Sequence, residues 1–512
     1  MRPAFRPLSA TPAPESGSDV LVVGLGPTGA VLALLLARAG VRVTVVEREP
    51  EVFPRPRAVF FDDEIMRVFQ KLELIPLLKS AVQPVKGMDL VNAQGELLYR
   101  YQAPQGPGVL GWEEGFMFHQ PELERILRAQ LAKYPTVNLL LGHTVEAVAA
   151  DAAGARVEVR GPKDHAMGAR ASYEVHASYV VGCDGARSVT REAMDAPLFD
   201  YHADAPWLVL DLLLEGAPDL PETTVQHCDP RRPSTFVPLP GGRCRFEFQV
   251  LPDDDPEAFS SADSVEGLLR PWLPPESYRV DRSAVYTFHG LVAESWQEGR
   301  VFLAGDAAHQ MPPFLGQGMC AGIRDAVNLA WKLERVLSGA AEPALLESYQ
   351  TEREPHVRQT VEVDLRLGGL IQTTDPGVAR ARDEEARSAG GGVPLSPPRF
   401  PLGPGLAREP DGAGVGLPFP QPILPDGDRL DEALGSGFAL VGGISPTPET
   451  RAVLDRLGTR YLSFPPPPIR HWLKDQCATA ALVRPDRLVL ALVSDPGELE
   501  EALESLARSV SG

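Results

Sequence analysis

The stretch Asp19-Val-Leu-Val-Val-Gly-Leu-Gly-Pro-Thr-Gly29 decides the fold of this 512-residue chain. Asp19–Val23 is short and apolar and predicts a buried strand, and the apolar spacing of Pro27–Ala39 predicts a helix that ends at Gly40. Val41–Val46 is rich in β-branched residues and predicts a second strand. The order strand, helix, strand is a βαβ unit, which indicates an α/β fold with a parallel sheet.

The turn inside this unit has the glycine spacing of a dinucleotide-binding site. Gly24 permits the tight turn, Gly26 lets the backbone approach a pyrophosphate, and Gly29 lets the helix pack on the sheet. Pro27 and Thr28 then open the helix, whose N-terminus stabilises phosphate charge. Glu47 ends the second strand, where a carboxylate can accept hydrogen bonds from a ribose. The motif predicts a dinucleotide but does not separate NAD from FAD.

A second segment favours FAD. Arg300–Asp306 reads as a strand that delivers Asp306 to a sheet edge, followed by a loop rich in glycine and proline and a helix over Asp325–Leu337. A loop that feeds a helix N-terminus offers backbone N–H groups and the positive end of a dipole. Such a loop suits the anionic reduced isoalloxazine, and Asp306 suits the ribityl hydroxyls. His309, next to it, reads as a structural residue of this loop.

The pattern changes along the chain in ways that predict several parts. Between 200 and 290, short apolar segments separated by Pro, Gly and Asp turns predict an antiparallel sheet inserted into the α/β domain. We therefore expect a loose leader (1–18), a discontinuous nucleotide-binding domain (19–200 and 290–388), the inserted sheet (200–290), a Gly/Pro-rich linker (389–425) and a small C-terminal α/β domain (426–512).

Composition excludes several classes of protein. The net charge of −20, without a basic cluster, argues against binding to nucleic acid or to an anionic membrane surface. The apolar stretch Val20–Ala37 is interrupted by glycines, which argues against a membrane span. Five scattered cysteines without a C-x-x-C pair and the absence of a signal-peptide pattern predict a cytoplasmic protein. No metal-binding, serine-hydrolase or P-loop motif is present, so we expect no metal.

Taken together, these motifs resemble those of the single-component flavin-dependent aromatic hydroxylases. The likeness runs over about 20–360 and is greatest to those that act on 3-(3-hydroxyphenyl)propionate. It rests on the fingerprint at 24–29, the Asp-Gly motif at 184–185, the Gly-Asp motif at 305–306, and the stretches Pro56-Arg57-Ala58, Asp62-Asp63-Glu64, Cys228-Asp229-Pro230, 245–248, 316–318, 324–325 and 328–333. The resemblance implies a Rossmann-like FAD-binding domain, the inserted antiparallel β-sheet as substrate domain, and a C-terminal thioredoxin-like domain. With only Cys477 in it, that domain lacks a redox cysteine pair.

The resemblance also implies which residues contact FAD. Asp184 is expected to touch both FAD and the nicotinamide donor. Three of these residues could instead have a purely structural role: Asp184 as a turn residue, Arg57 as a surface arginine, and Gln120 as an N-terminal helix cap. The expected FAD contacts are Gly24, Gly26, Pro27, Thr28, Gly29, Glu47, Arg48, Arg57, Gln120, Asp184, Asp306, Pro313, Gly316, Gly318 and Met319.

The activity that the resemblance implies is monooxygenation. NADH or NADPH binds transiently and reduces FAD, O2 forms a flavin C4a-hydroperoxide, and a phenolic carboxylate such as 3-(3-hydroxyphenyl)propionate is ortho-hydroxylated. The alternatives are a hydroxylase of another phenol or of a polyketide, and a flavin-binding oxidoreductase without oxygenation. The expected partner is a small aromatic substrate, and the oligomeric state stays open, with a homodimer among the alternatives.

Substrate contacts are less defined. A group that assists phenol deprotonation would make the ring a better nucleophile, and His227, Tyr286 and His289 lie in or beside the inserted sheet. Each of the three also fits a packing or hydrogen-bonding role. An arginine is a common binding partner of a substrate carboxylate. The candidates by position are Arg231, Arg232, Arg243 and Arg245.

Overall fold

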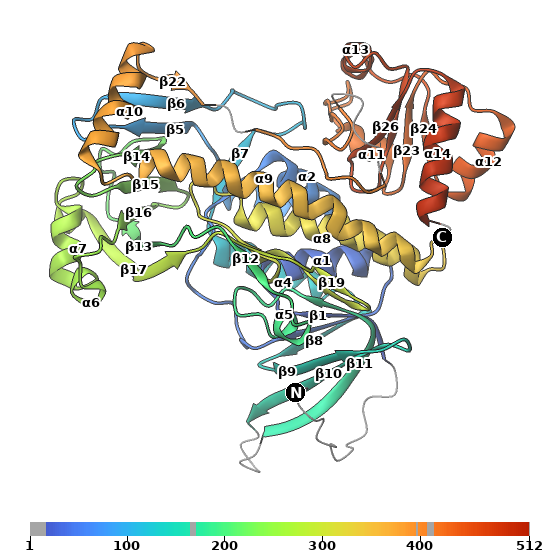
Figure 1. Cartoon of the computed structure of the whole chain (residues 1–512), viewed down its shortest axis with the longest axis horizontal. Helices are drawn as coiled ribbons and strands as arrows, with labels where there is room; N and C mark the ends of the chain where they lie inside the picture. Colours follow the sequence, from blue (N-terminus) through green and yellow to red (C-terminus); the bar gives the residue numbers. More distant parts are fainter. Residues whose placement is uncertain (1–16, 164–169, 396–397, 407–413, 511–512) are drawn as a thin grey trace.

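The structure, a computed structural model, describes residues 17–163, 170–395, 398–406 and 414–510. Of the predicted leader, residues 1–16 lie outside these ranges, and Ser18 already belongs to the first strand. The described chain forms a central α/β part, a second large sheet and a C-terminal α/β domain (Figure 1).

The predicted βαβ unit is confirmed as β1 (Ser18–Val23), α1 (Pro27–Arg38) and β2 (Val43–Glu47). It lies in a sheet of order β19-β20-β11-β1-β2-β8, in which the strands from β20 to β8 are parallel. The strand β10 extends this sheet by antiparallel pairing with β11, and β9 pairs antiparallel with β10. α1 packs against both α4 and α8. The other bounds are α4 (Gln120–Leu131), β8 (Val137–Leu141), β9 (Thr144–Ala150), β10 (Ala155–Lys163), β11 (Arg170–Gly182), β19 (Gln297–Glu298) and β20 (Val301–Leu303).

The second sheet has the order β17-β13-β16-β15-β14-β5-β6-β22. It contains the antiparallel strands expected between 200 and 290, but it also takes in β5, β6 and β22 from outside that range. The hairpin β5–β6 pairs with β14, which would otherwise be an open edge. The strands are β5 (Gly87–Val91), β6 (Leu97–Gln102), β13 (Ala205–Leu214), β14 (Thr224–His227), β15 (Ser234–Leu239), β16 (Arg243–Gln249), β17 (Tyr278–Phe288) and β22 (Val393–Pro394).

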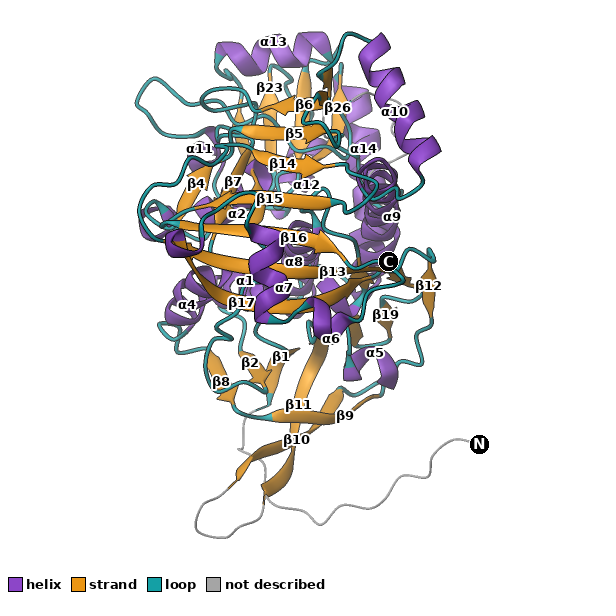
Figure 2. Ribbon diagram, turned by 90° about the vertical axis from the view of Figure 1, so that its left-hand side faces the viewer, coloured by secondary structure: helices purple, strands orange, loops and turns teal. Residues whose placement is uncertain are grey.

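Helices cover both large sheets. Figure 2 shows α7 (Ala262–Leu269) and α6 (Pro256–Phe259) lying over β13, β16 and β17. Two long helices, α8 (Gly318–Leu337) and α9 (Ser348–Ile371), run side by side across the middle of the molecule, and α10 (Pro376–Ser388) follows (Figure 1). The helix expected from Asp325 already begins at Gly318. This start could not be predicted, because the N-cap residue Gln317 makes no side-chain capping bond and is not a typical capping residue.

Short elements connect these parts. A three-stranded sheet of β3, β7 and β4 lies beside α2, and another of β12, β18 and β21 precedes the loop to α8. The bounds are β3 (Phe60–Asp62), α2 (Asp63–Lys71), α3 (Ile75–Leu78), β4 (Val82–Pro84), β7 (Gly115–Phe118), α5 (Val189–Ala193), β12 (Leu198–Asp200), β18 (Leu291–Ala293) and β21 (His309–Gln310), with 3-10 turns at Pro275–Ser277, Gly305–Ala307 and Pro343–Glu347.

The C-terminal domain is a four-stranded sheet of order β24-β23-β25-β26, in which only β23 and β24 are parallel. The parallel strands β23 and β24 are joined by a helix and followed by the hairpin β25–β26, which is the thioredoxin topology. Phe419 is buried in this domain's core, so the packed domain begins before residue 426, where composition placed its start. Its elements are α11 (Leu430–Leu434), β23 (Ala439–Gly442), α12 (Pro448–Arg456), β24 (Arg460–Leu462), α13 (Pro467–Asp475), β25 (Ala480–Val483), β26 (Val489–Val493) and α14 (Pro496–Val510).

Three features of the described residues bear on function. No helix among them has both the length and the apolar character needed to cross a membrane. In the same ranges, no three His, Cys, Asp or Glu side chains are grouped in a way that could hold a metal ion. All five cysteines are free thiols.

Candidate functional site

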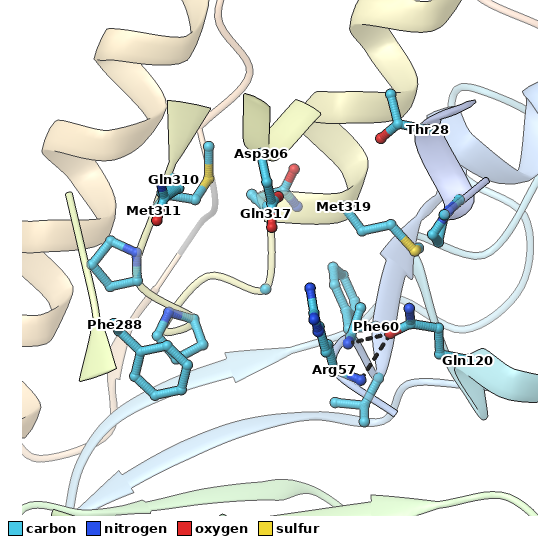
Figure 3. Close-up of a pocket in the computed structure, with 18 of the residues that line it drawn as sticks. Thr28, Arg57, Phe60, Gln120, Phe288, Asp306, Gln310, Met311, Gln317 and Met319 are labelled. Atoms are coloured by element: carbon cyan, nitrogen blue, oxygen red, sulfur yellow. Dashed lines mark hydrogen bonds between the residues drawn. The ribbon is translucent and has the colours of Figure 1, made fainter. Parts of the chain in front are cut away.

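One large cavity, of about 1860 Å³, extends from the first βαβ turn to the second sheet. The residues that line it come from β1, β2, the segment 55–64, the strands β13 to β17, the loop before α8 and the helix α9. Figure 3 shows side chains from several of these elements converging on this space. The cavity therefore joins a dinucleotide-binding motif to the sheet expected to hold a substrate.

The three fingerprint glycines differ in what surrounds them. A Cβ at Gly24, whose φ is +95°, would lie 2.5 Å from the Cys183 carbonyl oxygen, and a Cβ at Gly29 would lie 2.2 Å from the Gly24 carbonyl oxygen. At Gly26, by contrast, a Cβ would meet nothing within 4 Å, and this residue lines the cavity. Gly26 is the N-cap of α1, which has no side-chain cap. Open space before an uncapped helix N-terminus is what a pyrophosphate requires, so these residues fit the group.

Glu47 ends β2 inside the cavity wall. Its two carboxylate oxygens accept the N–H groups of Leu25 and Glu49 at 2.7 and 2.8 Å. Each oxygen has a second lone pair that remains available to a ribose hydroxyl. Arg48, next to it, is exposed and also lines the cavity.

The main chain of Arg57 is held from two sides. The Gln120 Oε1 accepts the N–H groups of Arg57 and Ala58 at 2.8 and 2.7 Å, and Arg245 donates to the Arg57 carbonyl oxygen at 2.7 Å. The Arg57 guanidinium itself has no partner in the part of the chain that the structure describes, and it extends into the cavity (Figure 3). Gln120 also donates to Glu124 at 2.7 Å, so it acts on the site by fixing Arg57.

Asp306 lies in the turn after β20, as the strand-end motif predicts. Its side chain is open to the cavity, and desolvation by the surrounding protein raises the pKa of its carboxyl, with His309 and Arg57 opposing the shift. His309 is buried and its Nε2 lies 2.7 Å from Asp325 Oδ2, which also accepts the Gly305 N–H at 3.0 Å. This pair holds the turn that presents Asp306.

Asp184 lines the cavity, and its carboxylate also serves as a local acceptor. It takes the Ser188 hydroxyl at 2.6 Å and both the N–H and the hydroxyl of Thr190 at 3.1 Å. These contacts stabilise the start of α5. The turn role of Asp184 is therefore explained by the protein alone, with no need for a bound cofactor. Its contact with FAD stays a prediction.

The loop from Met311 to Met319 forms one wall of the cavity. Pro313, Gly316, Gly318 and Met319 all line it, and their contacts with FAD, which the resemblance implies, stay predictions. Gly316, with φ of +67°, faces the ring of Phe60, and a Cβ there would lie 2.9 Å from that ring. Figure 3 shows Met319 on the side of Thr28 and Gln120, while Met311 lies near Phe288 on the opposite side.

Of the three candidates for phenol deprotonation, two line the cavity. His289 is paired through Nδ1 with Asp204 Oδ1 at 2.7 Å, and the Tyr286 ring lies 4.5 Å below the Arg282 guanidinium. His227 is outside the cavity, where its ring contacts Trp272 at a centroid distance of 4.7 Å. The reason is strand alternation: Gln226, its neighbour on β14, faces the cavity instead.

The carboxylate-binding candidates separate in the same way. Arg231 and Arg232 are bonded to Asp229 and Asp254, and neither they nor Arg243 line the cavity. Arg245 does line the cavity, but its guanidinium already donates hydrogen bonds to Asp211 at 2.7 Å and to the main-chain carbonyls of Arg57 and Pro56.

Several arginines that the sequence analysis did not propose as site residues also line the cavity, Arg282 and Arg366 among them. Arg282 is buried against Asp211 and the Pro56 carbonyl. Arg366 on α9 is exposed and has no partner among the described residues. No local motif marks Arg366, because an arginine in a helix is most often a surface residue.

The chain matches known proteins over most of its length. The family model described as "FAD binding domain" matches residues 17–364. The chain is 37% identical to a probable NADH-specific resorcinol 4-hydroxylase of Rhodococcus jostii (strain RHA1), over 96% of this chain and 95% of that protein. It is 35% identical to a 3-(3-hydroxy-phenyl)propionate/3-hydroxycinnamic acid hydroxylase of Mycolicibacterium smegmatis, over 91% of this chain and 85% of that protein.

Solved structures show the same fold at lower identity. The flavin-dependent monooxygenase PieE, in complex with FAD and substrate, matches with a TM-score of 0.81 at 24% identity, over 97% of this chain and 99% of that chain. Aklavinone-11 hydroxylase with FAD and aklavinone matches with a TM-score of 0.79 at 24% identity, over 98% of this chain and 100% of that chain. The predicted fold class is confirmed. The family match over most of the chain, and relatives alike over nearly their whole length, show that this chain belongs to the FAD-dependent aromatic hydroxylases.

Proposed function

We propose that this protein uses NADH or NADPH and O2 to ortho-hydroxylate a phenol that carries a carboxylate side chain, with 3-(3-hydroxyphenyl)propionate as the model substrate. The observation that carries the proposal is the single cavity that connects Gly26 and Asp306 with Tyr286 and Arg366. It is supported by the substrates and the donor named for the relatives, including NADH for the protein of R. jostii.

The residues proposed to hold FAD follow the cavity from one end to the other. The turn at Gly26 would receive the pyrophosphate and Glu47 the adenosine ribose. Asp306 would accept from the ribityl chain, and the loop around Gly316 would face the ring system. Bound there and reduced, FAD supplies the oxygen-activating chemistry, so no protein nucleophile is needed. The further proposed contacts are Gly24, Pro27, Thr28, Gly29, Arg48, Arg57, Gln120, Asp184, Pro313, Gly318 and Met319.

The protein's own contribution is to orient the phenol and to accept its proton. With Nδ1–H donating to Asp204, the His289 imidazole keeps Nε2 as an acceptor. A phenol whose hydroxyl lies near this nitrogen is deprotonated as the ring becomes the nucleophile. Phe288, Met311 and Pro312 line the cavity with apolar surface that keeps water from the reacting atoms.

Arg366 supports a carboxylate on the substrate. Arg245 and Arg282 are both held by Asp211, and Arg245 also lies 3.7 Å from Glu247, whereas Arg366 is a cation of the cavity wall with no partner among the described residues. A guanidinium can bind a carboxylate through two parallel hydrogen bonds. The position of Arg366 on α9 beside Leu367 and Leu370, which also line the cavity, suits a carboxylate joined to an apolar spacer.

A neutral phenol such as resorcinol is the second candidate substrate, because the relative from R. jostii is named for it. The two are separated by kcat/KM of the purified holoenzyme with each compound and by the Arg366→Met variant. For the carboxylate substrate, we expect Arg366→Met to raise KM about 10- to 100-fold, equivalent to losing about 1.5–3 kcal/mol. Resorcinol kinetics should be unchanged in the same variant. Wild-type turnover of resorcinol alone would instead favour the second candidate.

A further inference from the structure

The cavity loop between Met311 and Gly316 has little structure of its own. It contains Pro312 and Pro313, which have no N–H to donate, and it is closed by one turn bond from the Gly316 N–H to the Pro313 carbonyl at 2.9 Å. The position of this wall therefore depends on what holds it from behind. That support comes from α9.

Asp364 holds the loop by its main chain. Its Oδ1 accepts the Leu315 N–H at 2.6 Å, and the side chain is fully buried. Its Oδ2 has no partner in the described part of the chain. Burial raises the pKa of this carboxyl well above its usual value, with the Leu315 N–H opposing the change. A buried carboxyl with one partner is costly, so its contact with the loop is the feature that explains it.

Gly368, one turn further along α9, sets how closely the loop approaches. A Cβ at this position would lie 2.6 Å from Cε2 and 2.7 Å from Cδ2 of Phe314. The Phe314 ring is buried and also packs edge-on against Trp207 at a centroid distance of 6.0 Å. Since the ring is enclosed from both sides, a side chain at 368 would push it, and the loop, toward the cavity.

Both residues are poor choices for the helix itself. Glycine in a helix interior costs about 1 kcal/mol relative to alanine, and aspartate is also unfavourable there. Neighbouring Gly369 gives the contrast, because a Cβ at that position would meet nothing within 4 Å. Local preference is overridden at the two positions that touch the loop.

We propose that Asp364 and Gly368 are positioning residues that together fix the loop 312–316 and so set the spacing between the flavin ring and the bound phenol. This proposal rests on the proposed function. Oxygen transfer needs reacting atoms about 3–3.5 Å apart, and a misplacement of about 1 Å can cost 10²-fold in rate. A displaced loop should therefore leave FAD bound but reduce the share of NADH that ends in hydroxylated product.

The test compares Gly368→Ala with Gly369→Ala in the full-length holoenzyme. Three quantities are measured: the FAD dissociation constant from fluorescence, the flavin absorption spectrum of the oxidised protein with and without 3-(3-hydroxyphenyl)propionate, and the ratio of product formed to NADH consumed. For Gly368→Ala we expect FAD affinity within about threefold of wild type, altered flavin bands, and a product ratio at least threefold lower. Gly369→Ala should match wild type in all three.

A second pair of variants tests Asp364. Asp364→Asn keeps an acceptor for the Leu315 N–H, and Asp364→Leu has the same branched shape without one. We expect the asparagine to restore both the spectrum and the product ratio that the leucine loses. Equal behaviour of Gly368→Ala and Gly369→Ala would overturn the proposal, as would an asparagine variant as impaired as the leucine variant. If wild type hydroxylates no phenol, the proposed function fails, and the flavin spectra alone decide the positioning role.

Discussion

Arg484 of the C-terminal domain and Glu352 of α9 form a two-pronged buried ion pair, with Nη1–Oε1 and Nη2–Oε2 distances of 2.8 and 2.9 Å. Lys332 of α8 donates to the same carboxylate at 2.8 Å. Burial alone would raise the pKa of Glu352, but Arg484 and Lys332 bring it far below its usual range. The C-terminal domain thus contributes Arg484, which is also paired with Asp486 at 2.7 Å, to a buried charge cluster with the two central helices.

Replacing Arg484 with methionine should therefore destabilise the whole protein. Removing one partner of a buried pair leaves the remaining charges undercompensated, which costs about 3–5 kcal/mol. Urea unfolding of the purified protein measures the loss. Arg231→Met is the matched control, because Arg231 forms an exposed pair with Asp229 and should cost under about 1 kcal/mol. Similar losses in both variants would argue against a special role for the interdomain pair.

Gly26→Val should abolish retention of FAD without unfolding the chain. Its φ of −69° is open to any residue, and the new side chain would project into open space where we place the pyrophosphate. Absorbance of the purified protein at flavin wavelengths measures FAD content. Gly267→Val, at an exposed position of α7, is the control, since a Cβ there also meets nothing within 4 Å. A normal FAD content in Gly26→Val would show that the glycine motif at 24–29 does not bind the FAD pyrophosphate.

Asp306→Ala should weaken FAD binding about 10- to 100-fold while leaving the unfolding midpoint close to that of wild type. The expected loss is that of one charge-assisted hydrogen bond, about 1.5–3 kcal/mol. Asp306→Asn retains an acceptor oxygen and should lose less. Fluorescence titration of apoprotein with FAD gives both constants, and an unchanged constant for the alanine variant would contradict the ribityl contact.

Asp63 should make stability depend on pH in an unusual direction. Desolvation raises its pKa to about 6, with Arg399 opposing the shift, so the folded state binds this proton more tightly than the unfolded state. Between about pH 4 and pH 6, wild type should lose stability relative to Asp63→Asn as pH rises, by at most about 3 kcal/mol. Urea unfolding of both proteins at several pH values checks this. If the stability of wild type relative to Asp63→Asn stays constant or rises with pH, the folded state does not bind the Asp63 proton more tightly than the unfolded state.

The sequence predicts the nucleotide-binding unit well because its signals are local. The strand before Gly24, the helix after Pro27 and the acid at Glu47 each depend only on neighbouring residues. The strand-end position of Asp306 follows from the same kind of signal. Long-range pairing has no such signal, so the addition of β5 and β6 to β14 could not be predicted.

Side-chain direction limits the prediction of the substrate site. Gln226 and His227 are adjacent on β14, and only a register fixed by the whole sheet decides which one faces the cavity. Arg366 and Gly368 present the same problem on a helix, where the face that meets the cavity depends on how α9 packs. Such residues become visible only when distant elements are brought together.

The fate of dioxygen tests the proposed monooxygenase activity most directly. Holoenzyme, NADH and 3-(3-hydroxyphenyl)propionate are incubated under isotopically labelled O2, and the product is analysed by mass spectrometry. The proposed function predicts a catechol that carries one labelled oxygen atom, formed only when the phenol is present. Oxidation of NADH that yields hydrogen peroxide alone with this substrate, with resorcinol and with related phenols would contradict it.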